Sequence, residues 1–108
     1  MTLDEYETLA MRTHHNSPRL TVDGLPIYHC LGLAGEAGEF VDKIKKSWRN
    51  QAPLDRDAAL RELGDVLWYI TACARDLGSS LEEVASLNIA KLADRAARGV
   101  IKSEGDNR

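Results

Sequence analysis

The chain has 108 residues, of which 29% are charged and 44% hydrophobic, and its net charge at pH 7 is −3. This length favours one domain with a modest core, and we expect a single domain at 1–108, with its core at 25–99 and a flexible tail at 100–108. The acidic balance provides no general basic field, so we expect no nucleic-acid partner.

The sequence also argues against a membrane or secreted protein. It has no apolar run long enough to span a bilayer, and the N-terminal stretch MTLDEYETLA lacks the basic and apolar regions of a signal peptide. Cys30 and Cys73 have neither CxxC nor metal-ligand spacing, and we expect both to be structural thiols in apolar helical surroundings. These observations predict a cytoplasmic protein without a membrane partner.

Pro and Gly clusters divide the chain, and helical periodicity fills the intervals without an alternating strand pattern. Thr2 and Ser80 each precede a glutamate by three residues, which is typical of a capping box, and Asp55 is a predicted N-cap. Gly78 and Gly99 are predicted helix stops. Four helices with short links predict an all-α four-helix bundle. The predicted helices lie at 2–14, 26–48, 55–77 and 80–97, with a loop at 15–26.

The predicted helix at 26–48 begins with Pro26 in its first turn and contains the glycine-rich stretch GLAGEAGEF at 32–40. Each of its three glycines costs a helix about 1 kcal/mol relative to alanine. On a helical projection two of them share a face with Glu36 and Glu39, where we expect them to leave room for ions, phosphates or a neighbouring helix. The third lies in the apolar arc, where we expect it to permit close helix packing. These glycines are, in order, Gly32, Gly35 and Gly38.

The rest of this helix is apolar over about half of its circumference, in two adjoining stripes. So much apolar surface exceeds what one small bundle covers, and we therefore expect self-association. We expect Trp48 and Trp68 to be packing residues. The first stripe contains Ile27, Leu31, Ala34, Val41 and Trp48, and the second contains Leu33, Ala37, Phe40 and Ile44.

A second pair of carboxylates, Glu62 and Asp65, lies on the predicted helix at 55–77, beside a core stripe of Leu60, Leu63, Val66, Leu67, Ile70 and Ala74. Residues three apart lie within one helical turn, so each pair could reach one ion. A single pair is ordinary on a solvated helix face. Two pairs on two helices, with glycines on one of these faces, indicate a cation site, and oxygen ligands are those that Mg²⁺ prefers.

Four stretches of the chain, GLAGEAGEF, KIKK, ELGDVLWYI and LEEVASLNIAKLADR, follow one another in this order. Over residues 25–99 the chain resembles the MazG-like nucleoside triphosphate pyrophosphohydrolases of the all-α NTP pyrophosphatase superfamily, whose signature is ExxE, a spacer and ExxD. The resemblance implies Mg²⁺, with Mn²⁺ as a substitute, bound by four carboxylates that are both metal ligands and catalytic residues. In this sequence they are Glu36, Glu39, Glu62 and Asp65.

The resemblance also implies the reaction: cleavage between the α- and β-phosphates of a (d)NTP to give a monophosphate and pyrophosphate, including house-cleaning of non-canonical nucleotides. Metal-bound water suffices as nucleophile, and which carboxylate acts as general base stays open. Tyr69 is expected beside the nucleoside and Asn88 at the sugar or base. Four cations are candidates for the triphosphate, the last two being favoured because their strip borders apolar residues: Lys43, Lys46, Lys91 and Arg95.

Several alternatives remain open from the sequence. They are a dUTP- or dCTP-specific pyrophosphatase, a relative of phosphoribosyl-ATP pyrophosphohydrolase, and a non-catalytic helical nucleotide sensor. The family often has an aromatic residue and a proline after its closing arginine, whereas this chain has Ala96-Ala97-Arg98-Gly99, which leaves the C-terminal contribution to the pocket open. The resemblance points to a homodimer or a dimer of dimers.

Overall fold

A computed structural model of the chain describes residues 1–15 and 21–99, and the predicted tail at 100–108 lies outside them. The expectation of an all-α chain with four α-helices is confirmed. None of the helices in the described ranges has the length and apolar character needed to cross a membrane. The elements are α1 (Leu3–Ala10), the 3₁₀ turn η1 (Met11–Thr13), β1 (Thr21–Val22), β2 (Leu25–Pro26), α2 (Tyr28–Asn50), α3 (Arg56–Asp76) and α4 (Leu81–Arg98).

The helix ends follow the predicted capping signals. The side chains of Thr2, Asp55 and Ser80 each accept a hydrogen bond from the backbone N–H three residues later, at 3.1 Å in all three cases. Gly78 and Gly99 follow α3 and α4 with φ of +74° and +71°, a conformation that glycine adopts without steric cost. Local sequence therefore determines where three of the four helices begin and where two of them end.

The prediction of an uninterrupted loop at 15–26 is wrong over its second half. Thr21 pairs with Pro26, and Val22 with Leu25, in a short antiparallel ribbon. The connecting residues Asp23 and Gly24 both have positive φ, +50° and +79°, which is the conformation of a tight hairpin turn. Because Pro26 belongs to β2, α2 begins at Tyr28 and the predicted position of Pro26 in its first turn is also wrong.

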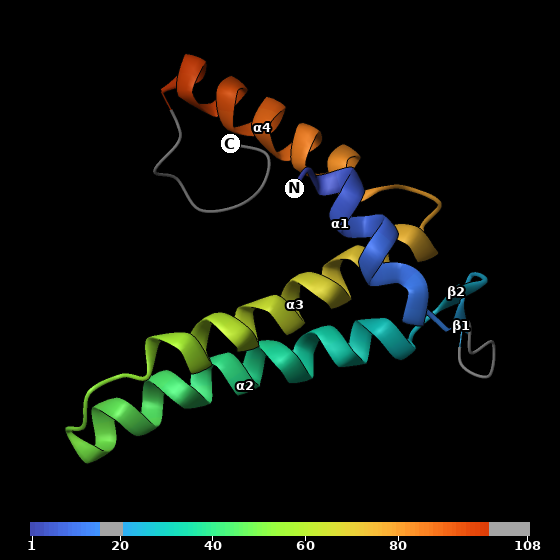
Figure 1. Cartoon of the computed structure of the whole chain (residues 1–108). Helices are drawn as coiled ribbons and strands as arrows, with labels where there is room; N and C mark the ends of the chain where they lie inside the picture. The colour runs from blue at the N-terminus through green and yellow to red at the C-terminus, as the bar shows by residue number, and fades with distance from the viewer. Residues whose placement is uncertain (16–20, 100–108) are drawn as a thin grey trace.

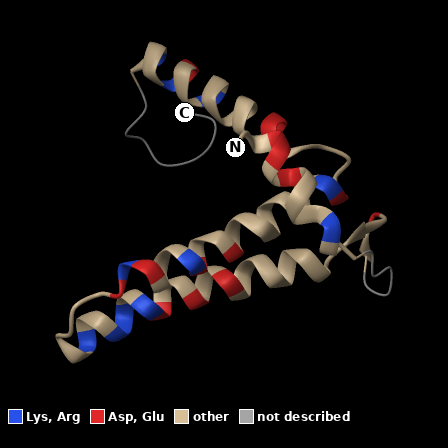
Figure 2. Cartoon of the chain, viewed as in Figure 1, with Lys and Arg blue, Asp and Glu red and all other residues tan. Residues whose placement is uncertain are grey.

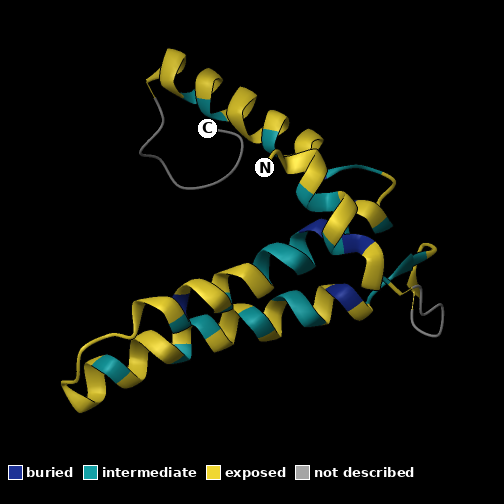
Figure 3. Cartoon of the chain, in the orientation of Figure 1, coloured by how far each residue is buried: buried dark blue, intermediate teal, exposed yellow. Residues whose placement is uncertain are grey.

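Figure 1 shows α2 and α3 lying side by side as a helical hairpin, while α4 turns away from this pair. α4 contacts α1 and α3, so α1 lies at the junction between the hairpin and α4. The most buried apolar residues gather mainly at this junction, where Figure 3 shows most of the dark blue segments. They include Met11 at 6% exposure, Ala72 at 0%, Ala74 at 3% and Leu81 at 5%.

Much of the apolar surface predicted to be core lies open in a single chain. On α2, Leu31 is 63% exposed, Val41 59% and Trp48 80%, so Trp48 does not pack within the described part of a single chain and its packing role stays a prediction. On α3, Leu60 and Leu63 are also exposed, whereas the stripe on α2 that contains Leu33 and Phe40 is only partly buried. The physical reason is the arrangement of the helices, because no described segment covers the first stripe of α2.

α2 and α3 approach each other closely at Gly32. A Cβ atom added to this glycine would lie 2.1 Å from Cε1 of Tyr69, so a neighbouring helix does occupy the room that Gly32 leaves. Gly35 and Gly38 have no atom within 4 Å of the corresponding position. The expectation that Gly38 permits close helix packing is therefore wrong within the described part of one chain.

We predict that Gly32→Ala lowers the free energy of unfolding by about 1–3 kcal/mol, because its methyl group collides with the Tyr69 ring. Gly35→Ala is the matched control on the same helix, and it should raise stability by up to about 1 kcal/mol through helix propensity alone. Urea unfolding measures both changes. Equal effects of the two substitutions would contradict the close approach at Gly32.

Candidate functional site

Three of the predicted ligand carboxylates come together midway along the helical hairpin. Glu36 extends from α2, and Glu62 and Asp65 extend from α3, so that one oxygen of each lies within 4.8 Å of the others. Figure 2 shows acidic residues on both helices in this part of the hairpin. The spacing of three on α3 places two carboxylates within one turn, and packing against α2 adds the third.

Glu39 is not part of this group of three oxygens, although the sequence predicts it as a fourth ligand. It is exposed and lies almost one helical turn beyond Glu36. Its charge nevertheless acts at the site, because Glu39 is among the carboxylates that raise the pKa of Glu36. The predicted ligand set therefore divides into three converging carboxylates and one beside them.

Negative charges gather at the site. Burial raises the pKa of Glu36 first, and the nearby charges of Asp65, Glu62 and Glu39 raise it further. The pKa of Tyr69 is also raised, by burial first and then by Tyr28, Glu36 and Asp65. Like charges held this close favour protonation or the binding of a cation. The donor set consists only of carboxylate oxygens, which suits a hard divalent ion.

A pocket of about 310 Å³ adjoins these carboxylates. Tyr69 lines it as the sequence predicts, beside Glu36 and Asp65, and the pocket is completed by Trp68 and Thr13. The two aromatic rings meet edge to face, with centroids 5.0 Å apart. The site thus combines an acidic wall with an aromatic wall.

Sequence reasoning missed Trp68 and Thr13 as pocket residues. Trp68 was expected only to pack; it is half-buried and its indole N–H donates to the carbonyl of Ala10 at 2.9 Å. Its position beside Tyr69 in ELGDVLWYI was a usable signal, since both residues follow the carboxylates on α3. No sequence pattern indicates Thr13 as a pocket residue, because it lies in η1, far along the chain from the carboxylates of α3.

The structure places the predicted phosphate-binding cations away from this pocket in a single chain. Lys43 and Lys46 line a different pocket near the far end of the hairpin, and Lys46 pairs with Asp42 at 2.8 Å. Asn88, Lys91 and Arg95 lie on α4, which diverges from the hairpin, and none of them is among the residues that line the carboxylate pocket. Their predicted roles stay predictions.

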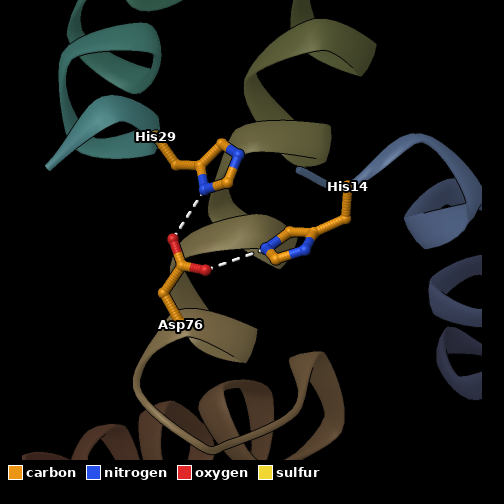
Figure 4. Close-up of side chains that lie close together, drawn as sticks. All are labelled: His14, His29 and Asp76. Atoms are coloured by element: carbon orange, nitrogen blue, oxygen red, sulfur yellow. Dashed lines mark hydrogen bonds and ion pairs between the residues drawn. The ribbon is translucent and has the colours of Figure 1, made fainter. Parts of the chain in front are cut away.

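A second polar cluster joins the N-terminal segment to the hairpin (Figure 4). His14 donates from Nε2 to Oδ1 of Asp76 at 2.8 Å, and His29 donates from Nδ1 to Oδ2 of the same carboxylate at 2.6 Å. The side chains of His29 and Asp76 are only 1% and 2% exposed. No sequence pattern indicates this cluster, because His29 and His14 lie 47 and 62 residues before Asp76.

The two cysteines also meet. Burial raises the pKa of Cys73 to about 11, and the neighbouring Cys30 thiol contributes to this rise. Cys30 itself is exposed and Cys73 is half-buried, so the expectation of two thiols in apolar surroundings is wrong for Cys30. Both are free thiols, and they face each other from α2 and α3 even though their sequence spacing matches no motif.

A helical hairpin with converging carboxylates beside a pocket is suited to holding a divalent cation next to a bound molecule. The chain matches the MazG nucleotide pyrophosphohydrolase domain over residues 28–100 and belongs to this family. It is also 42% identical over 92 residues to the Gene 37 protein of Mycobacterium phage L5, covering 82% of this chain and 80% of that protein. No solved structure matches the chain significantly.

We predict that Glu36→Gln stabilises the metal-free protein near neutral pH and weakens its response to divalent cations. Because the folded-state pKa of Glu36 is raised above its ordinary value of 4.5, ionisation of this group opposes folding, and its contribution to stability falls as pH rises through that pKa. The variant should therefore have the higher Tm in EDTA at about pH 7, with the difference shrinking as the pH falls below the raised pKa.

Thermal unfolding with EDTA and with a divalent cation measures both effects. Asp23→Asn is the control, because Asp23 lies in the ribbon turn and asparagine is accepted at positive φ there. A cation-induced rise in Tm that is the same in wild type and Glu36→Gln would contradict the ligand assignment.

Proposed function

We propose that the chain is a Mg²⁺-dependent nucleoside triphosphate pyrophosphohydrolase that cleaves the α–β phosphoanhydride to release a monophosphate and pyrophosphate. The observation that carries the proposal is the convergence of Glu36, Glu62 and Asp65 beside a pocket, in a chain that belongs to the MazG family. Mn²⁺ would substitute for Mg²⁺, since both accept oxygen ligands in octahedral geometry.

The three converging carboxylates would hold the metal, and Glu39, just beyond Glu36 on α2, would complete the set. When bound, Mg²⁺ neutralises phosphate charge and lowers the pKa of a water molecule. A carboxylate oxygen that faces this water would accept its proton, so no side-chain nucleophile is needed. The raised pKa of Glu36 supports this assignment, because burial and then the neighbouring carboxylates raise it, and a bound cation would relieve the repulsion among these carboxylates.

The aromatic wall of the pocket would hold the nucleoside. Trp68 and Tyr69 line the cavity with two aromatic rings that meet edge to face, and Thr13 also lines it. The carboxylates lie on the same cavity, so a nucleoside against the rings would direct its phosphates toward the metal. The pocket thus orders the substrate from base to triphosphate.

Self-association would complete this site. The open stripe on α2 and the exposed residues Leu87 and Ile89 on α4, each 65% exposed, provide the apolar surface for a homodimer or a dimer of dimers. In such an assembly α4 of a second copy would bring Asn88, Lys91 and Arg95 toward the pocket, which α4 of the same chain does not reach. This arrangement supports the predicted role of the α4 cations at the triphosphate.

We predict that the protein releases pyrophosphate and a monophosphate from at least one member of a panel of canonical and damaged dNTPs, including dUTP and dCTP, when Mg²⁺ is present. Asp65→Asn should lower kcat/KM by at least about 100-fold, because it removes a carboxylate ligand of the metal ion that would stabilise the reacting phosphate. Asp23→Asn serves again as the control. Nucleotide binding without any pyrophosphate release would support a sensor and contradict the enzyme.

We predict that sedimentation gives the mass of a dimer or a larger assembly, at least about twice the 12.0 kDa of one chain. Val41→Glu should dissociate it, since a carboxylate would replace an exposed valine on the α2 stripe. Val22→Glu is a matched control, because Val22 is 60% exposed and Val41 59%, but Val22 lies on the β-ribbon. Dissociation by both substitutions, or by neither, would contradict the assignment of this interface.

A further inference from the structure

The pocket depends on a wall that comes from outside the helical hairpin. Thr13, at the end of η1, lines the pocket beside residues of α2 and α3, and His14 is the next residue in the chain. The position of Thr13 at the pocket therefore depends on how the segment 10–14 is held, and within this segment the Thr13 hydroxyl donates to the carbonyl of Ala10 at 3.4 Å. Three contacts hold it: the burial of Met11, the hydrogen bond from Trp68 to Ala10, and the bond from His14 to Asp76.

Asp76 has an unusual position among these contacts. Its carboxylate is 2% exposed and accepts hydrogen bonds from both His14 and His29. One side chain at the end of α3 therefore connects the N-terminal segment to α2. The separations of 2.6 and 2.8 Å are hydrogen-bond lengths, which leave no room for an ion between the donors and the carboxylate. The cluster is a hydrogen-bonded clamp between three segments.

The clamp also contacts the aromatic wall of the pocket. The His29 ring lies 5.8 Å from Trp68 in an edge-to-face arrangement and 6.2 Å from Tyr69, measured between centroids. Its Nε2 atom is buried without a hydrogen-bond partner among the described residues. The bond from Nδ1 to Asp76 is therefore the one hydrogen bond of the His29 ring among the described residues, and it fixes the orientation of the ring.

We propose that Asp76, acting through His14 and His29, is a positioning residue that sets the Thr13 wall and the aromatic wall of the nucleotide pocket relative to the carboxylates. The inference rests on the proposed function. It assigns to the clamp an effect on nucleotide binding and none on metal binding, because none of its members belongs to the carboxylate group or lines the pocket.

The test uses His14, whose side chain is 12% exposed and lies at the edge of the clamp. His14→Ala should raise KM for the best dNTP about tenfold, with kcat changed by less than about twofold, because the wall is displaced while the reacting groups stay in place. Affinity for Mg²⁺, measured by calorimetry, should be unchanged. His15→Ala is the control, since His15 is the next residue, is exposed, and undergoes the same change from histidine to alanine.

Two further measurements separate positioning from a general loss of stability. His14→Gln should restore most of the wild-type KM, because its amide N–H reaches about as far as Nε2 and can donate to Asp76. In a Trp48→Phe background, Trp68 fluorescence should shift in His14→Ala and not in His15→Ala, since the Trp68 indole is bonded to the same segment.

The outcomes distinguish the two proposals. If the wild type hydrolyses no nucleotide, the proposed function fails, and with it the role of the clamp in the pocket. If the wild type is active but His14→Ala has the same KM as His15→Ala, or His14→Gln does not restore KM, the positioning role fails and the enzyme assignment stands.

Discussion

The close approach of α2 and α3 at Gly32 is the constraint on which the site depends. The Tyr69 ring occupies the space where a side chain at position 32 would lie, and Glu36 follows one turn later on α2 while Asp65 lies one turn earlier on α3. The contact therefore determines the distance between the two helices that supply the carboxylates. A bulkier residue at position 32 would move Tyr69 and change both the helix spacing and the pocket.

The same contact brings like charges together, and the fold gains no stability from that. Burial and then the charges of the neighbouring carboxylates raise the pKa of Glu36, so the hairpin holds these carboxylates against their mutual repulsion. Apolar contacts and the network at the junction with α1 must supply the stability, including the ion pair between Arg75 and Glu7 at 3.2 Å and the backbone N–H of Leu81 donating to Glu7 at 2.8 Å. The N-terminal segment thus stabilises the hairpin and also lines the pocket, through Thr13.

In a single chain the apolar stripe of α2 is exposed, and the cations of α4 do not line the carboxylate pocket. The stripe of α2 is open because α4 diverges from the hairpin. A helix that packed along the hairpin would cover this stripe and would carry its cations nearer to the pocket. In the proposed assembly, a second copy would cover the stripe and bring its α4 cations toward the pocket. This is why we tie the predicted phosphate contacts of Lys91 and Arg95 to self-association.

The sequence by itself determined the four helices, their caps at Thr2, Asp55 and Ser80, and the carboxylate spacing, because each depends on residues within one or two turns. It missed the ribbon at Asp23-Gly24, although that signal was local. Only the tertiary structure decided that Glu39 stands outside the converging group, that Thr13 walls the pocket and that His14 and His29 share Asp76. These features depend on helix rotation and on contacts between segments far apart in the chain, which periodicity does not encode.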